Sequence, residues 1–345
     1  MKYFKGSIAF TIVCLSIAAF LGYYGSGNAS AALSSVFICS VLAILEVSLS
    51  FDNAIVNATV LKNMNDIWQR RFLTWGVLIA VFGMRLLFPL LIVGIAAHLG
   101  PVAALQLAIS QPEHYAQALS AAHTAIMGFG GTFLAMVGLK YFFDEEKDIH
   151  WISIIERHFV RFAELEAIEI GIILLTLLII SYFLPTVEIP AFLIASTSGL
   201  VAFIAVEAIG NLIEPPEEAT TTAAKAGLGA FLYLEVMDAS FSFDGVIGAF
   251  ALSTNLFIIA LGLGIGAMFV RSLTIMLVKK GTMAEYRYLE HGAFWAILAL
   301  ALLMFVSIRQ DIPEVITGLI GAGLIGTALL SSIRWNKTNA GSETN

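Results

Sequence analysis

Charged residues are scarce in this chain. Asp, Glu, Lys and Arg make up 12% of its 345 residues, whereas a soluble domain carries about 25%. Hydrophobic residues account for 59% of the chain, and the mean hydropathy is +0.90. Apolar runs of about 20 residues, the length that crosses a bilayer, recur from one end to the other. Because these runs do not alternate in polarity, they predict an all-α, polytopic membrane protein rather than a β-barrel.

Cysteine is almost absent as well. The chain has only Cys14 and Cys39, both in or beside apolar runs and without a partner motif. This argues against a disulfide or a thiolate metal site. No polar segment is long enough for a soluble catalytic domain, and no acidic or basic tail stands out. We therefore expect neither an enzyme nor a nucleic-acid-binding protein, and no permanently bound cofactor.

The apolar runs predict about ten spans in the lipid bilayer. The first follows Lys2 and Lys5 and is longer than the apolar part of most signal peptides, so we expect an uncleaved helix. The spans divide the chain into two five-span halves, 1–184 and 185–345, with core repeats at 33–142 and 227–308. The polar segment 142–167 is the expected cytoplasmic linker and the surface for any protein partner. The spans are expected at 7–25, 33–60, 72–97, 123–142, 168–184, 191–212, 227–252, 256–278, 291–308 and 313–332.

The basic residues predict the orientation of these spans. With the N-terminus inside, fifteen of the eighteen Lys and Arg residues fall in cytoplasmic segments. The outer loops hold only Arg309, and the long loop 98–122 holds none. Cytoplasmic loops of membrane proteins are enriched in Lys and Arg. The remaining two, Arg85 and Arg271, fall inside spans three and eight, and both termini are expected in the cytoplasm.

An acidic motif occurs twice. The sequence EVSLSFDN begins at Glu46, and DASFSFDG begins at Asp238. In each copy a second acid, Asp52 or Asp244, follows the first by six positions. In the following span of each half, a glycine precedes an arginine by nine positions.

Spans two to four therefore correspond to spans seven to nine. This offset of five is odd, so the two copies must cross the membrane in opposite directions. Inverted repeats around a mid-membrane site, often with discontinuous helices, are typical of secondary transporters.

Helical spacing places Glu46, Ser50, Asn53 and Asn57 on one polar stripe. Asp52 lies about 120° off this stripe, at ~100° per residue. Either the helix is broken near the Ser-Phe-Asp segment, or Asp52 and its equivalent Asp244 each reach a different neighbour. The candidate neighbours are Arg85 and Arg271. Each charge at mid-membrane costs about 2.5–3.5 kcal/mol. These groups must pair, titrate or bind something.

The first motif resembles that of the TerC family of integral membrane proteins, whose form is Glu-x-x-Leu-Ser-x-Asp-Asn. EVSLSFDN matches it position for position, and an Arg in the following helix is shared at Arg85. A degenerate second copy fits DASFSFDG, although Asp238 and Gly245 depart from the first copy and the loops 98–122 and 142–169 are long. The resemblance is to a divergent branch. It implies the bacterial inner membrane, an association with tellurite resistance, and export of manganese or related divalent cations.

Three functions remain open. The first is a secondary transporter or exporter of a divalent metal ion, with proton coupling as an option. Mn²⁺ is favoured, because all-oxygen sites suit Mg²⁺, Ca²⁺ and Mn²⁺. The second is a transporter of an organic or oxyanionic solute bound by Arg85 and Arg271. The third is a non-transporting scaffold linked to tellurite or metal stress, with the acids locked in structural ion pairs. The candidate ligands are Glu46, Asp52, Asp238, Asp244, Ser50, Asn53 and Ser242, with Glu235 as a secondary candidate.

Overall fold

The computed structural model describes residues 2–97, 99–144, 147–163, 165, 167–213, 227–310 and 312–340. Within these residues every regular element is a helix. In chain order they are η1 (Lys2–Phe4), α1 (Lys5–Ser26), α2 (Ala29–Leu49), α3 (Phe51–Leu61), α4 (Asp66–Leu78), η2 (Ile79–Leu87), α5 (Phe88–Ala96), α6 (Pro101–Ser110), α7 (Pro112–Ala121), α8 (His123–Phe142), α9 (Ser153–Ala163), α10 (Ile168–Phe183), α11 (Ile189–Ile213), α12 (Leu228–Leu252), α13 (Leu256–Lys279), α14 (Thr282–Glu285), α15 (Leu289–Ser307) and α16 (Glu314–Ala340).

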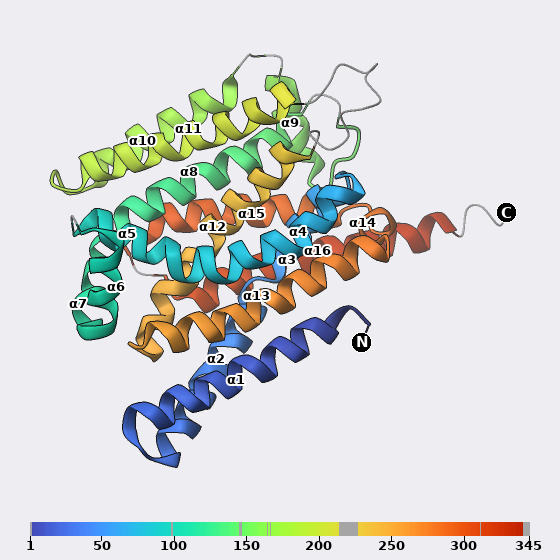
Figure 1. Cartoon of the computed structure of the whole chain (residues 1–345). Coiled ribbons are helices and arrows are strands. Elements are labelled where there is room, and N and C mark those ends of the chain that lie inside the picture. The colour runs from blue at the N-terminus through green and yellow to red at the C-terminus, as the bar shows by residue number, and fades with distance from the viewer. Residues whose placement is uncertain are drawn as a thin grey trace.

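The long helices run side by side in one bundle (Figure 1). The α1–α2 hairpin flanks the bundle on one side, the α10–α11 hairpin flanks it on the other, and α8, α12 and α15 lie between them. The short helices α5, α6 and α7 cover one end. The helices α9 and α14 lie at the other end, where the described chain both begins and finishes.

Local sequence fixes where several helices begin. The side chain of Asn28 accepts the Ala31 N–H at 2.8 Å at the start of α2, and Asn65 accepts the Trp68 N–H at 3.0 Å at the start of α4. Such N-caps satisfy backbone donors that have no partner inside the helix. Prolines occupy the first positions of α6 and α7, where the missing N–H costs nothing. These two short helices fill the loop 98–122.

Seven of the described helices are long and apolar enough to cross a membrane: α1, α2, α8, α11, α13, α15 and α16. The pair Asp66–Gly76 and Ile79–Ile95, bent by 42°, makes an eighth if it is one span. Each of the ten predicted spans coincides with a helix or a broken helix, but the count of ten stays a prediction. The helix α10 has only 16 residues, and α12, with 25, carries three acids.

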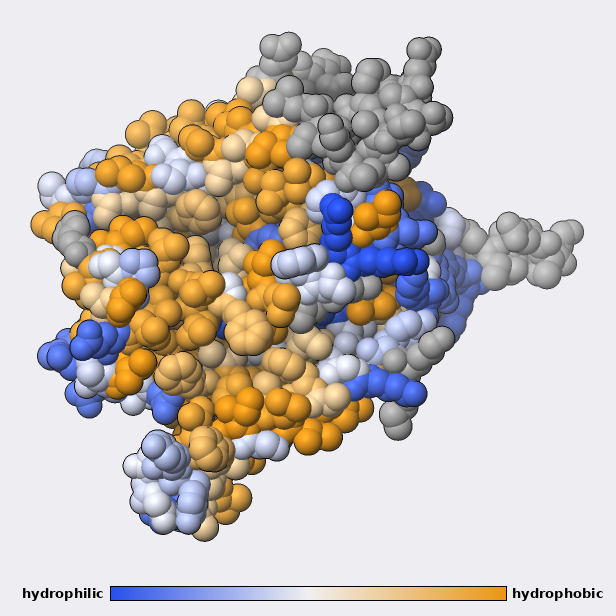
Figure 2. Space-filling view, viewed as in Figure 1, coloured by the Kyte–Doolittle hydropathy of each residue, from blue (hydrophilic) through white to orange (hydrophobic). Residues whose placement is uncertain are grey.

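Apolar side chains cover much of the outer surface. On α1, for example, Ile12 and Phe20 are both 63% exposed. Figure 2 shows a broad hydrophobic surface over the middle of the bundle, with hydrophilic residues gathered mainly at its ends. Soluble monomers rarely expose apolar patches of this size. The fold is therefore that of a multi-pass membrane protein whose outer helices face lipid.

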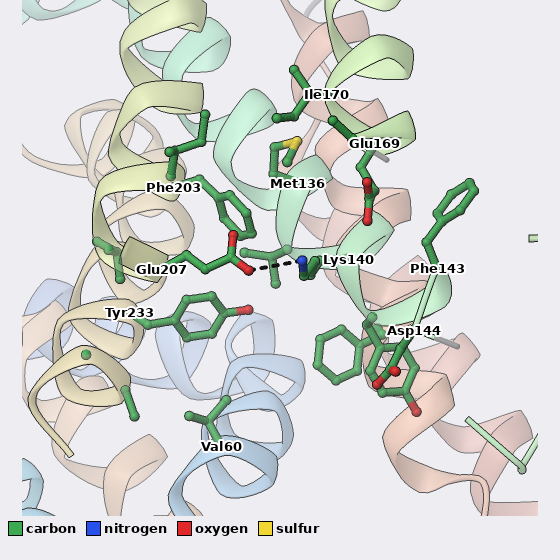
Figure 3. Close-up of a pocket in the computed structure, with 18 of the residues that line it drawn as sticks. Val60, Met136, Lys140, Phe143, Asp144, Glu169, Ile170, Phe203, Glu207 and Tyr233 are labelled. Carbon is green, nitrogen blue, oxygen red and sulfur yellow. Dashed lines mark ion pairs between the residues drawn. The ribbon is translucent and has the colours of Figure 1, made fainter. Parts of the chain in front are cut away.

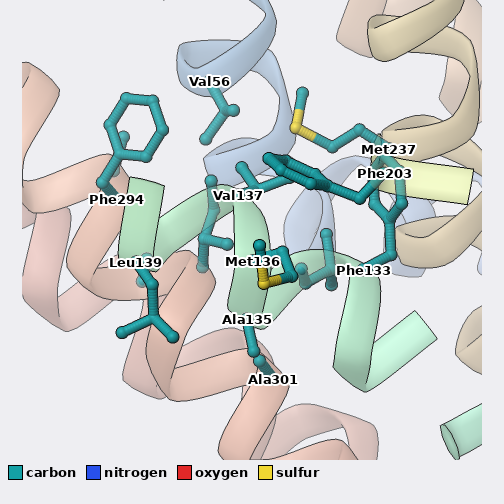
Figure 4. Packing of buried hydrophobic residues seen from close by; sticks show 14 of the residues in the cluster. Val56, Phe133, Ala135, Met136, Val137, Leu139, Phe203, Met237, Phe294 and Ala301 are labelled. Carbon is teal, nitrogen blue, oxygen red and sulfur yellow. The ribbon is translucent and has the colours of Figure 1, made fainter. Parts of the chain in front are cut away.

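The core lies around α8, the most buried of the candidate spans. It packs against α11, α12 and α15. Figure 4 shows the buried cluster where Phe133 and Met136 of α8 meet Phe203 of α11 and Met237 of α12. Without a hydrophobic driving force in lipid, close van der Waals packing holds such helices together.

The described part of the predicted linker 142–167 packs onto the end of the bundle. In α9 the Glu156 carboxylate is 1% exposed and accepts the Trp295 indole N–H at 3.0 Å and the Trp151 backbone N–H at 3.0 Å. The Phe159 ring lies 5.1 Å from that of Phe143. One face of α9 is therefore occupied by the bundle, while Ile154 on the other is 80% exposed.

Candidate functional site

The first acidic motif lies where a predicted span is broken. The helices α2 and α3 are separated by Ser50, which leaves helical geometry at φ −98° and ψ 23°. Serine and aspartate compete with the backbone for hydrogen bonds and so favour helix ends. Ser50 Oγ donates to Glu46 Oε1 at 3.3 Å, and Asp52 Oδ1 accepts the Asn53 N–H at 2.8 Å. The second motif has no such break, because α12 is continuous.

A small cavity of about 50 Å³ lies at this break. Glu46, Ser50, Asp52 and Asn53 line one side, and Gly245 of α12 lines another, with α15 and α16 completing the walls. One water needs roughly 10–15 Å³ of such space. The cavity therefore accommodates a few waters or a partly hydrated ion.

Arg85 projects from a widened stretch of helix. Residues Ile79–Leu87 (η2) form a π-helix, which is followed by Pro89. A proline ring clashes with the carbonyl four residues earlier, here that of Arg85, and provides no N–H. The wider turn accommodates this, since the Phe88 N–H bonds to the Gly83 carbonyl five residues back. Such π-turns occur often at functional sites.

The Arg85 guanidinium is ion-paired with Glu46. The two side chains are 3% and 5% exposed, and Arg85 also donates to the Ala80 carbonyl at 2.5 Å. The sequence left two alternatives open, a helix broken near the Ser-Phe-Asp segment or an Asp52 side chain that reaches a different neighbour, with the arginines as candidates. The helix is broken at Ser50, and Arg85 meets Glu46 of α2, whereas Asp52 opens α3.

Arg271 of α13 holds the acids of the second copy. Its Nη2 lies 3.3 Å from Glu235 Oε1 and 3.7 Å from Asp238 Oδ2. Its Nη1 donates to the Phe72 carbonyl at 2.9 Å, and the guanidinium carbon lies 4.0 Å from the centre of the Phe72 ring. All three charged side chains are buried. Glu235, the secondary candidate, is thus part of this ion-pair network.

The repeated glycine before each arginine allows a close approach. A Cβ added at Gly76 would lie 2.6 Å from Glu235 Oε1 and 2.5 Å from Arg271 Nη1, so only glycine leaves room for that ion pair. A Cβ at Gly262 would lie 2.7 Å from Leu42 Cβ. The two glycines therefore serve helix packing beside the charged groups.

The two motifs touch each other across the bundle. Asn53 Nδ2 of the first copy donates to Asp238 Oδ1 of the second at 2.8 Å, with both side chains buried. In the other direction, a Cβ added at Gly245 would lie 3.3 Å from Glu46 Oε2. In the alignment of the two motifs, Gly245 of the second copy is equivalent to Asn53 of the first, and Asp238 of the second is equivalent to Glu46 of the first. Each copy thus contacts the other through equivalent positions.

The helix α16 covers Asp52. A Cβ added at Gly321 would lie 2.9 Å from Asp52 Oδ2, and one at Gly318 would lie 2.5 Å from Leu49 Cδ2. The Asp52 side chain is partly exposed, and no arginine or lysine pairs with it within the described part of the chain. Nothing in the motif spacing indicated that the last span would close this site.

The remaining candidate ligands, Ser242 and Asp244, belong to the second motif. Ser242 is buried on α12. Asp244 also belongs to α12, but its side chain lies outside the described residues. Among the described residues, no three or more His, Cys, Asp or Glu side chains form a group placed to hold a metal ion. The metal-ligand roles therefore stay predictions.

Sequence reasoning missed a second, larger cavity of about 900 Å³ between α8, α10, α11 and α12. Lys140 of α8 and Glu207 of α11 point toward each other across it, with Nζ and Oε1 3.0 Å apart (Figure 3). Glu207 ranks low from sequence because no equivalent exists in the other half. Only the folded arrangement shows its partner.

Fold and site together define a polytopic helical membrane protein with charged groups paired inside its bundle. The chain belongs to the family described as Protein of unknown function (DUF475), whose model matches residues 51–339. No curated protein and no solved structure matches the chain. The family description carries no activity, so the function must be argued from the site itself.

Proposed function

We propose that this protein is a secondary transporter that moves a small cation through the break between α2 and α3. The observation that carries the proposal is the cavity at this break. It brings the carboxylates of Glu46 and Asp52, the Ser50 hydroxyl and the Asn53 amide to one small space. Discontinuous helices beside a mid-membrane site are a common way for transporters to bind ions.

The charge balance supports a cation as the substrate. Four described carboxylates, those of Glu46, Asp52, Glu235 and Asp238, face two guanidinium groups. If all six are ionised, two negative charges have no counter-charge among these described groups. One divalent cation or two protons would balance them, which fits metal transport with proton exchange. A scaffold has no need for unbalanced charge, which is costly in lipid.

The donor chemistry supports a hard divalent ion, and we favour Mn²⁺. The cavity offers only oxygen and amide groups, and both cysteines lie elsewhere. Oxygen ligands suit Mg²⁺, Ca²⁺ and Mn²⁺, whereas Zn²⁺ and Cu⁺ favour His and Cys. In this conformation the Glu46 carboxylate is ion-paired with Arg85. A passing cation must therefore displace that guanidinium or bind mainly to Asp52.

The reciprocal contacts between the motifs support an inverted repeat. An axis that exchanges the two copies would convert the contact of Asn53 with Asp238 into that of Gly245 with Glu46. It would also exchange the ion pair of Arg85 with that of Arg271. We propose that the two halves rock about this axis in a bacterial inner membrane, with both termini in the cytoplasm.

The alternative of an anionic substrate has less support. Both arginines already bind carboxylates and backbone carbonyls. An oxyanion would have to displace these partners from two buried groups, against the net negative charge of the site.

The test is flux of divalent cations in everted membrane vesicles that contain the protein. Mn²⁺, Mg²⁺, Ca²⁺, Zn²⁺ and Co²⁺ are presented singly, with a pH-sensitive dye reporting proton movement. We expect accumulation of Mn²⁺ above vesicles without the protein. Absence of flux for every cation, together with flux of an oxyanion such as tellurite, would favour the anion transporter.

A further inference from the structure

The larger cavity, which we call the antechamber, is lined by residues of α8, α10, α11, α12 and the end of α3. Its volume of about 900 Å³ is in the range of small-molecule sites. It lies toward the end of the bundle that carries α9 and α14, as the positions of Lys140 and Asp144 at the end of α8 show.

The charge of the antechamber is negative, although this end of the bundle is rich in basic residues. Glu207 and Glu169 contribute two carboxylates, and Lys140 contributes the single ammonium among the described lining residues. Figure 3 shows the Glu169 carboxylate of α10 directed toward the space near Lys140. The Lys140 and Glu207 side chains are 56% and 38% exposed, so the pair is accessible from the cavity.

The antechamber also lies close to the cavity at the helix break. Tyr233 lines the antechamber, and Phe241, eight residues later on α12, lines the smaller cavity. At a rise of 1.5 Å per residue the two positions are about 12 Å apart along the helix. One core helix, α12, thus lines both cavities.

Met237 lies on α12 between Tyr233 and Phe241 and is buried. Met136, Phe203 and Met237 belong to one core cluster, and the first two also line the antechamber. Figure 4 shows these three side chains close together in the core. Methionine has three rotatable bonds and adapts its shape easily. We call these three side chains the plug, and its two methionines are able to repack.

We infer that the antechamber is a cation-binding site that collects the substrate before it passes the plug to the helix break. The inference rests on the proposed function for the identity of the substrate. Its electrostatic part does not, because a locally negative chamber concentrates cations of any kind. A gap filled by lipid tails would concentrate neither cations nor anions.

The test is the charge selectivity of thiol labelling. Cys14 and Cys39 are replaced by Ala, and Ala230→Cys introduces one thiol into the antechamber lining. Purified protein in detergent reacts with a cationic methanethiosulfonate, the trimethylammonium-ethyl reagent, or an anionic one, the sulfonatoethyl reagent. The ratio of the two rates cancels any change in the fraction of thiolate. Thr338→Cys, on the exposed end of α16, gives the reference ratio.

We expect the cationic reagent to be favoured at Ala230→Cys by roughly three- to tenfold over the reference. Glu207→Gln should lower this preference, and Lys140→Gln should raise it. Opposite shifts cannot come from misfolding, which would move both variants in the same direction. Equal rates of the two reagents, or shifts of the same sign, would overturn the inference.

Labelling requires no transport, so it separates the two proposals. A cation preference without flux would leave the antechamber as a cation site and count against the transporter. Flux without a cation preference would uphold the transporter and place the path of the substrate elsewhere. A thiol at Ala230→Cys that reacts with neither reagent, while Thr338→Cys reacts with both, would show that the chamber is closed to water and would also overturn the inference.

Discussion

Asn53 Nδ2 donates a hydrogen bond to Asp238 Oδ1 at 2.8 Å, which joins the two acidic motifs inside the bundle. Hydrogen bonds to charged groups contribute about 1.5–3 kcal/mol. Asn53→Ala should therefore lower the free energy of unfolding by about this amount. A double-mutant cycle with Asp238→Ala, measured by denaturation in detergent, should give a coupling energy close to this loss. A coupling energy near zero would mean that other contacts hold the motifs together.

The ion pair between Glu46 and Arg85 predicts a rescue. Glu46→Gln leaves a guanidinium that is 3% exposed without its counter-charge, and such a loss costs about 3–5 kcal/mol. The pair Glu46→Gln with Arg85→Met should recover most of the lost stability. The combination Asp52→Asn with Arg85→Met is the matched control. It should stay as unstable as Arg85→Met alone, because Glu46 is still left without its partner. Recovery by Asp52→Asn instead would favour a pairing of Asp52 with Arg85.

The approach of α16 to Asp52 predicts a contrast between two glycines of that helix. Gly321→Ala places a Cβ 2.9 Å from Asp52 Oδ2, and overpacking of this kind costs about 1–3 kcal/mol. Gly326→Ala meets nothing within 4 Å and should be neutral or gain up to about 1 kcal/mol of helix propensity. Thermal unfolding of both variants checks this. Equal effects would show that α16 does not close over Asp52.

Lys147, outside the spans, predicts a pH dependence of stability. Its ammonium nitrogen lies 3.6 Å from the centre of the Tyr141 ring, and burial lowers its pKa to about 8, although Glu156, Glu290 and Asp144 oppose the shift. Between this pKa and the usual value near 10.5, the unfolded chain binds one more proton at Lys147, so stability rises with pH there.

Lys147→Met removes the buried charge and serves as the reference for this titration. Any advantage of the variant over the unmodified protein should be largest below pH 8 and shrink as the pH approaches 10.5. Thermal midpoints of both proteins, taken side by side at each pH, cancel the titration of other groups. A difference that stays constant across this range would contradict the shifted pKa.

The positions of the helices were largely predictable, because long apolar runs form helices wherever lipid excludes water from the backbone. Each predicted span coincides with a helix or a broken helix, and the break at Ser50 was one of two possibilities that the polar stripe left open. The π-helix around Arg85 was not foreseen, although Pro89 is a signal for it. The short helices α6 and α7 were also missed, although Pro101 and Pro112 mark where they begin.

The partners of the charged residues were less predictable. Spacing placed Glu46 and Asp52 in one motif, but Glu46, in the helix before the break at Ser50, is the one that meets Arg85. The closure of Asp52 by Gly321 depends on how the last helix packs, and the pair of Lys140 with Glu207 joins helices that share no motif. Such contacts arise from packing between distant segments, which a single sequence does not encode in its local pattern.

The most direct test of the proposed function compares cation flux through two variants that each lose one carboxylate. Asp52→Asn keeps the shape of the side chain at the helix break but removes a charge that has no basic partner among the described residues. Asp148→Asn removes an exposed charge in the loop before α9. With equal amounts of folded protein in vesicles, we predict that Asp52→Asn abolishes Mn²⁺ flux and that Asp148→Asn leaves it unchanged. Full flux through Asp52→Asn would contradict a cation path at the break.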